Sequence, residues 1–411
     1  MRRAVLLGIA YTRNDRIERD LIELGELARS IGIFPVARFW QFLKVPLKTY
    51  MGKGKLGNIA EYIRLYEADG VITDDELRPV QKSNLEKMLK VEVLDRTQII
   101  LRNFARSAQT SEGKTEVELA MLEYRLSHIK GSSNYLSRAA GGIGARGPGE
   151  SKLEMDRRTV RKRIARLRSK IRKISEERVL KRRKRLTSII PKVSIVGYTN
   201  AGKSMLLKVL SGFEVKSENK LFTTLNPTTK KVWLGENVFA LFSDTVGFIS
   251  KLPPQLIKAF RSTMEETLDA DLILMVADGY DEDVNEKLRI SERVLENIGA
   301  ADVARVTVIS KIDLCNESRL KELVREHEDA VFISAKKNLY IDELMARLRD
   351  EITKDYLEKE LEIPNEIWPT VSKTIGVRVM KFKQTGDVVQ AKLKIHPFLV
   401  KKIMEENRVL S

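Results

Sequence analysis

The sequence has no run of about 18 consecutive apolar residues, the length that a helix needs to cross a bilayer. Its opening stretch, MRRAVLLGIAYTRND, turns polar too soon to form the apolar core of a secretory signal. Cysteine occurs once, at Cys315, so an intramolecular disulfide and a cysteine-based zinc site are both excluded. These absences argue against membrane-spanning and disulfide-stapled proteins. We expect a soluble, cytoplasmic protein.

The chain has 411 residues, 43% of them hydrophobic, and a formal net charge of +17. This length predicts two to four domains with sizeable cores. The charge is concentrated between Lys152 and Arg185, where seventeen Lys and Arg face four Asp and Glu, a net of +13. Such a run can be a solvated helix face or a membrane-surface segment. A near-pure basic run favours a nucleic-acid backbone, which releases its own counterions on binding.

Residues 1–95 alternate strand-like and helix-like segments, which predicts βαβ units and an open, mainly parallel sheet. Gly52–Lys55 and Thr73–Glu76 lie near strand-to-helix turns, where such sheets bind ligands. Both segments can equally be a turn and a helix cap. The expected strands are Ala4–Ile9, Phe34–Phe39, Gly70–Thr73 and Val91–Leu94, and the expected helices are Arg16–Ile31, Leu56–Tyr66 and Pro79–Leu89.

From Thr97 the pattern becomes a long helix, and two apolar stripes with spacings of three and four predict an antiparallel helical hairpin. The joining loop, Gly131–Glu150, holds six glycines together with Tyr135, Arg138 and Arg146. It is either a disordered tip or a probe that inserts into RNA. The stripes are Leu119, Leu122, Leu126 and Ile129 on one helix and Val160, Ile164, Leu167, Ile171 and Ile174 on the other.

The remaining chain predicts an α/β domain followed by a small α+β module. Gly376–Lys383 and Val388–His396 alternate with period two, which indicates a β-hairpin, and Pro397–Glu406 is expected to be a closing helix. We therefore expect an α/β multidomain protein. Its predicted parts are an open-sheet domain at 1–104, the basic hairpin at 105–190, a nucleotide-binding domain at 191–355 and the module at 356–411.

Residues 197–204 read GYTNAGKS, a complete G-x-x-x-x-G-K-S motif between a strand-like run, Val193–Val196, and a helix-like run, Met205–Leu210. Strand, glycine-rich loop and helix together form a phosphate cradle. Lys203 is expected to reach the β- and γ-phosphates and Ser204 to offer its hydroxyl to Mg²⁺. A chance match in a glycine-containing turn is the alternative. The expected nucleotide contacts are Gly197, Tyr198, Thr199, Asn200, Ala201, Gly202, Lys203 and Ser204.

Three further segments, each at the end of a predicted strand, complete the nucleotide site, and the last two identify the base. Asp244 is expected to hold Mg²⁺ through water, and the Gly247 N–H to sense the γ-phosphate. The segment Ser310, Lys311 and Asp313 offers a carboxylate that accepts from N1–H and the exocyclic amine of guanine, a pattern that adenine lacks. A backbone N–H within Ser334, Ala335 and Lys336 is expected to meet guanine O6. The order of these segments predicts GTP rather than ATP.

With these motifs in place, the chain resembles the HflX family of ribosome-associated GTPases over nearly its whole length. Leu221–Thr229 is similar to that family's first switch, and Asp244–Ile249 with Leu252-Pro253 to its second. Outside the GTPase domain, Tyr50–Leu56, Asp95–Thr97 and Gly141–Glu150 also match the family. The glycine-rich loop combined with a downstream GTPase domain makes the resemblance specific.

The resemblance implies GTP and GDP binding with Mg²⁺, and ribosome binding through large-subunit RNA, associated in bacterial relatives with ribosome splitting or rescue under stress. It implies that Thr224 is the switch threonine that meets Mg²⁺ and the γ-phosphate, with Thr223, Thr228 and Thr229 as alternatives. All four can instead be polar residues of a mobile loop. Asn200 stands where some related GTPases bind K⁺. We expect a monomer without DNA specificity or membrane insertion.

Two features modify the expected activity. Ser310 stands where the family has asparagine, and this shorter side chain is expected to reach less far towards the base. Phe248 stands where many GTPases place a glutamine that orients the attacking water, so we expect slow intrinsic hydrolysis, stimulated by the ribosome. The expected catalytic residues are Lys203, Thr224 and Gly247. The alternative is a helicase-like, RNA-remodelling enzyme with a second nucleotide site in the N-terminal domain. A membrane-signalling GTPase is disfavoured because the sequence lacks a lipidation motif.

Overall fold

The computed structural model describes residues 1–12, 16–108, 110–139, 148–185, 189–212, 228–245, 247–251, 253, 267–400 and 403. The chain forms two compact units. The first contains Met1–Glu177 together with Ser250 and Lys251, and the second contains a six-stranded sheet and the C-terminal module. Within the described ranges, no helix is both long enough and apolar enough to cross a membrane.

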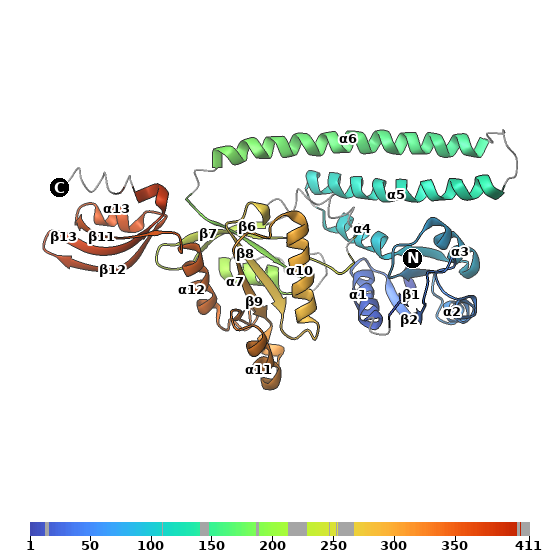
Figure 1. The fold of residues 1–411 in the computed structure, drawn as a ribbon, viewed down its shortest axis with the longest axis horizontal. Coiled ribbons are helices and arrows are strands. Elements are labelled where there is room, and N and C mark those ends of the chain that lie inside the picture. The colour runs from blue at the N-terminus through green and yellow to red at the C-terminus, as the bar shows by residue number, and fades with distance from the viewer. Residues whose placement is uncertain are drawn as a thin grey trace. The chain divides into compact units, whose positions relative to one another are not determined.

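The first unit begins with a four-stranded parallel sheet of order β2-β1-β3-β4, shown in blue in Figure 1. The predicted open sheet is therefore confirmed. Strands and helices alternate along the chain because each parallel connection needs a crossover. The strands are β1 (Arg3–Ala10), β2 (Phe34–Phe42), β3 (Gly70–Thr73) and β4 (Glu92–Asp95), and the helices are α1 (Ile17–Ser30), α2 (Lys53–Leu65), α3 (Pro79–Leu89) and α4 (Arg96–Ser107).

The acidic turn after β3 is used for structural contacts. Asp74 is fully buried and accepts a hydrogen bond from Arg96 Nη1 at 2.5 Å, and Arg96 is itself 2% exposed. Asp75 accepts from the Tyr50 hydroxyl at 2.7 Å. Lys251, which belongs to the same unit, contacts Asp74 as well. These partners compensate buried charges that would otherwise be costly, and they favour the structural interpretation of Thr73–Glu76.

Helices α5 (Ser111–Ala139) and α6 (Pro148–Arg185) form the predicted hairpin (Figure 1). Apolar residues of both stripes pack together, among them Leu119 with Val160 and Ile164. Ion pairs between Arg163 and Glu118 (2.8 Å) and between Arg168 and Glu123 (2.7 Å) flank this seam.

Two details of the helical prediction were wrong. The helix expected from Thr97 is broken, since α4 ends at Ser107 and Ala108 adopts an extended conformation. The expected loop from Gly131 is helical as far as Ala139, because one glycine costs a helix only about 1 kcal/mol and the residues after it tolerate helical geometry. The rest of that loop, residues 140–147, lies outside the described residues.

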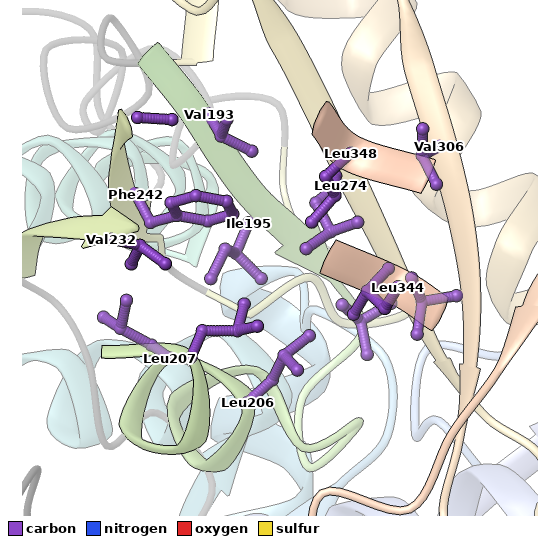
Figure 2. Packing of buried hydrophobic residues seen from close by; sticks show 14 of the residues in the cluster. Val193, Ile195, Leu206, Leu207, Val232, Phe242, Leu274, Val306, Leu344 and Leu348 are labelled. Carbon is purple, nitrogen blue, oxygen red and sulfur yellow. The ribbon is translucent and has the colours of Figure 1, made fainter. Parts of the chain in front are cut away.

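The second unit contains a six-stranded sheet of order β10-β9-β8-β5-β7-β6, in which only β6 runs antiparallel to its neighbour. Its core is formed by side chains such as Ile195, Leu206 and Phe242, which point towards one another in Figure 2. The elements are β5 (Lys192–Gly197), α7 (Lys203–Ser211), β6 (Thr228–Trp233), β7 (Phe239–Asp244), β8 (Leu272–Asp278), α10 (Val284–Ile298), β9 (Arg305–Ser310), α11 (Glu317–Glu326), β10 (Val331–Phe332) and α12 (Ile341–Ile352).

The C-terminal module contains an antiparallel sheet of order β11-β13-β12 and the short helix α13 (Trp368–Lys373). Strands β12 (Val377–Thr385) and β13 (Val388–Ile395) confirm the predicted hairpin. Strand β11 (Leu357–Pro364) was missed, because Lys359 interrupts its alternating apolar pattern. Residues 397–400 and 403 of the expected closing helix are helical, and its other five residues lie outside the described residues. The sheets and helices of both units confirm a multidomain α/β fold.

Candidate nucleotide-binding site

The described site lies where neighbouring parallel strands end. Register pairs join Ile195 of β5 to Asp244 of β7, and Asp278 of β8 to Ser310 of β9. Because these strands are parallel, their carboxyl ends share one edge of the sheet, which is where α/β sheets bind ligands. The folding of this sheet therefore brings together motifs that are more than 100 residues apart in the sequence.

The loop from Gly197 to Ser204 depends on two glycines. Gly197 has a φ of 145°, and a Cβ at this position would lie 2.1 Å from the Val276 carbonyl oxygen. Gly202 has a φ of 98° and caps α7. Asn200 also has a positive φ, 62°, a conformation that asparagine tolerates better than most residues. The loop leads directly into the N-terminus of α7, and a helix N-terminus favours a bound anion such as phosphate.

Lys203 is 7% exposed, and its ammonium donates to the carbonyl oxygens of Gly197 (3.1 Å) and Tyr198 (2.8 Å). Burial lowers the pKa of Lys203 to about 8, against the opposing influence of the Asp244 carboxylate. A phosphate beside this group would stabilise its charged form. The geometry thus holds a buried cation ready for an anion.

Ser204 and Asp244 supply the oxygen ligands that Mg²⁺ prefers. The Ser204 hydroxyl donates to Asp244 Oδ2 at 2.6 Å, and Asp244 is 1% exposed. Among the described residues, no group of three or more His, Cys, Asp or Glu could hold a metal ion. A hydroxyl and one carboxylate fit a magnesium ion that takes its remaining ligands from nucleotide phosphates and water.

The segment after Asp244 lies against the phosphate loop. A Cβ on Gly247 would lie 2.8 Å from Thr199 Cγ2 and 3.0 Å from Lys203 Nζ, so only glycine fits there. The Phe248 N–H donates to the Gly197 oxygen at 3.0 Å, and the Thr199 N–H donates to the Phe248 oxygen at 2.8 Å. The Phe248 side chain is 3% exposed and has no group that could hydrogen-bond to water.

The expected base-recognition residues also meet at one place. Asp313 Oδ1 accepts from the Ser334 hydroxyl at 2.6 Å, which fixes the carboxylate. The Lys311 ammonium pairs with Asp278 Oδ2 at 2.7 Å. The Ser334 N–H donates to the Leu339 oxygen, so a donor to guanine O6 has to come from Ala335 or Lys336. Sequence reasoning missed Asp278, although its position at the end of a buried strand was a usable signal.

Ser310 makes a contact with the phosphate loop. Its side chain is buried, and its hydroxyl donates to the Ala201 carbonyl oxygen of the phosphate loop at 2.5 Å. A Cβ on Gly202 would lie 3.4 Å from the same hydroxyl. The sequence-based expectation for Ser310 did not include this contact. It joins the base-recognition strand to the phosphate loop.

Replacing Ser310 by alanine is expected to weaken GTP and GDP binding by about 1–3 kcal/mol, because the buried Ala201 oxygen loses its donor. The loss should be equal for guanosine and inosine nucleotides, since the contact acts on the phosphate loop. Titration calorimetry with Ser310→Ala and, as the matched control, Ser310→Thr, which keeps the hydroxyl, would measure it. A loss confined to guanosine nucleotides would contradict this role.

Of the four candidates for the switch threonine, the structure describes two. Thr224 and Thr223 lie outside the described residues. Thr228 and Thr229 lie in β6, where Thr228 is in register with Asp244 and the Thr229 hydroxyl is 2.9 Å from the Ser243 hydroxyl. Thr228 and Thr229 therefore lie in a strand rather than in a loop.

Three family models match the chain. Their descriptions are GTP-binding GTPase N-terminal (residues 18–105), GTP-binding GTPase Middle Region (107–185) and 50S ribosome-binding GTPase (192–311). A protein named GTPase HflX from Caldanaerobacter subterraneus subsp. tengcongensis is 42% identical over 94% of this chain and 87% of its own length. GTPase HflX of Escherichia coli K12 is 36% identical over 88% of this chain and 85% of its own.

Among solved structures, a GTP-binding protein from Sulfolobus solfataricus in complex with GDP is 25% identical to this chain. The match covers 86% of this chain and 99% of that one, with a TM-score of 0.45.

Proposed function

This chain belongs to the HflX family of GTPases and hydrolyses GTP, and from that premise we propose that it is a GTP-switched factor that binds the ribosome through large-subunit RNA. One observation carries the choice of RNA as partner. On α6, Val160, Ile164 and Leu167 are buried against α5, whereas basic residues such as Arg161 and Arg166 are exposed on its other faces. Packing and RNA contact therefore do not compete for the same side chains. The exposed basic residues include Arg158, Arg161, Lys162, Arg166 and Lys173.

Neutralising part of this face tests the proposal. In a variant with Arg161, Lys162, Arg166 and Lys173 changed to glutamine, ribosome affinity should fall and its dependence on salt should weaken. The logarithmic salt slope should decrease by roughly 0.9 for each phosphate that the variant no longer neutralises. A control with Lys359, Lys381 and Lys383 of the C-terminal module changed to glutamine should keep the wild-type slope. Equal slopes for both variants would overturn the proposed RNA surface.

We propose the following roles for the motif residues. Lys203 and the loop from Gly197 bind phosphates, Ser204 and Thr224 hold Mg²⁺, and Asp313 selects guanine. GTP would order Thr224 and the segment Asp244–Phe248. Hydrolysis would release both of them from the γ-phosphate, as in other phosphate-sensing switches. The proposal includes four domains, at residues 1–104, 105–190, 191–355 and 356–411.

Asn200 is exposed in the phosphate loop, at the position where some related GTPases bind K⁺, and we propose that its side-chain oxygen binds K⁺ beside the nucleotide. Intrinsic GTP hydrolysis should then be faster in K⁺ than in Na⁺ at equal ionic strength. The variant Asn200→Ala should lose that difference while it keeps GTP binding. Identical wild-type hydrolysis rates in the two salts would contradict the proposal that K⁺ binds at this site.

A helicase-like enzyme with a second nucleotide site remains the alternative, because one observation favours it. A cavity of about 470 Å³ lies among α3, α4 and α5, lined by Lys82, Arg102, Tyr124, Arg125 and His128 among others. The volume of this cavity and its basic and aromatic lining are typical of a ligand pocket. Nucleotide hydrolysis that survives Lys203→Ala would support this alternative, and its complete loss would exclude a second hydrolytic site.

A further inference from the structure

Residues 34–67 combine aromatic side chains with positive charge to an unusual degree. These 34 positions hold seven aromatic residues, whereas aromatic residues make up 6% of the chain. The same stretch has six Lys and Arg against two Asp and Glu, a net of +4. Neither the nucleotide site nor the basic hairpin uses this segment. Its composition is typical of surfaces that stack unpaired nucleic-acid bases.

Three rings of this segment form a continuous row, here called the aromatic ladder: Phe39, Tyr62 and Tyr66. Phe39 and Tyr62 have centroids 4.9 Å apart in an edge-to-face arrangement, and Tyr62 and Tyr66 stack with centroids 5.9 Å apart and planes 13° from parallel. Tyr62 and Tyr66 are one turn apart on α2 and its C-terminal end, which places them on one face.

The outer side of the ladder is open to solvent. Tyr62 is 41% exposed and Tyr66 is 39% exposed, while Ile59 and Ile63 of the same helix are buried in the core of the sheet. The strand that carries Phe39, β2, is at the edge of the described sheet. The core of the unit therefore does not require the exposed faces of these two tyrosines, and a planar ligand can reach them.

A cation lies beside the ladder. Lys55 Nζ lies 5.6 Å from the centre of the Phe39 ring. Lys53, Arg38 and Arg64 are exposed on the same strand and helix. Such cations suit the phosphates that link successive stacked bases.

We propose that the aromatic ladder is a stacking platform for unpaired RNA. The proposal rests on the proposed function, because it identifies one structural element of the ribosomal RNA that the N-terminal part would engage. Ring faces stack on any base and require the base to be unpaired, so the platform distinguishes single-stranded from double-stranded RNA without reading sequence. A duplex hides its base faces and offers the ladder only phosphates and sugars.

The test uses the full chain with Tyr62 and Tyr66 both changed to leucine, which keeps apolar bulk but removes the rings. The matched control changes both to phenylalanine and keeps the rings. The probe is an unpaired oligoribonucleotide that carries 2-aminopurine, whose fluorescence is quenched when it stacks on an aromatic ring. Its duplex form is the second probe. Unfolding curves and the intrinsic GTPase rate report whether the variants fold.

Wild type and the phenylalanine variant should bind the unpaired probe with quenching and prefer it to the duplex. The leucine variant should lose the quenching, bind roughly 5- to 150-fold more weakly per stacked base, and keep the wild-type salt slope. Changing Lys53 and Lys55 to glutamine should instead lower the slope, by about 0.7 for each phosphate that these lysines neutralise in the wild type.

Wild-type affinity and quenching in a folded leucine variant would overturn the platform, and this is also the result expected if the ladder binds a protein. Ribosome binding by the wild type distinguishes failure of the proposed function from failure of the stacking platform. If wild type fails to bind ribosomes, the proposed function fails. If it binds them and the leucine variant still quenches the probe, only the platform fails.

Discussion

Replacing Asp313 by asparagine is expected to shift the preference of the site from guanosine to xanthosine nucleotides. The Asp313 carboxylate is held by the Ser334 hydroxyl and can accept from both N1–H and the exocyclic amine of guanine. Two hydrogen bonds to a charged group contribute about 1.5–3 kcal/mol each, so GTP affinity should fall roughly 10²- to 10⁴-fold. Xanthine has a carbonyl in place of that amine, and the asparagine amide can donate to it. Competition binding with GTP, XTP and ATP measures the shift.

The variant Ser310→Ala is the control for that shift, since it acts on the phosphate loop and should lower affinity for every base alike. Selectivity for GTP that stays unchanged in Asp313→Asn would show that the base binds elsewhere.

Ribosomes or large subunits are expected to accelerate GTP hydrolysis by about 10³- to 10⁵-fold, the range seen when a missing catalytic element is supplied by a partner. The reason lies in Phe248. Its backbone is bonded to the phosphate loop and its side chain is buried, so it offers nothing to orient the attacking water. Single-turnover rates with and without purified subunits measure the effect.

Two variants separate binding from chemistry in that experiment. Lys203→Ala should abolish hydrolysis in both conditions. The glutamine variant of the α6 basic residues should keep the intrinsic rate but require more ribosomes for stimulation. Equal rates with and without ribosomes, at concentrations where the wild type binds, would contradict the proposed partner-supplied activation.

The phosphate loop could be predicted in detail because its requirements are local. Gly197 and Gly202 need positive φ, and the strand and helix that flank them are readable from short apolar runs. The strand-end position of Asp313 could be predicted for the same reason. The Ser310 contact could not, since it joins residues 109 positions apart and depends on how closely β9 approaches the phosphate loop.

The same distinction applies to the N-terminal part. The parallel sheet follows from the alternation of segments, but the partners of Asp74 do not, because Arg96 and Lys251 reach it only after folding. The aromatic ladder was missed in the same way. Phe39 lies 23 residues from Tyr62, and only the packing of β2 against α2 brings their rings together.

Co-sedimentation with ribosomal subunits, with GDP or a non-hydrolysable GTP analogue at two salt concentrations, tests the central claim that GTP controls ribosome binding. The account predicts that the GTP-analogue form sediments with large subunits at both salt concentrations, while the GDP form is released at the higher one. Binding that is independent of nucleotide and wholly lost at the higher salt would contradict it, and would leave a basic RNA-binding protein whose GTPase site serves another purpose.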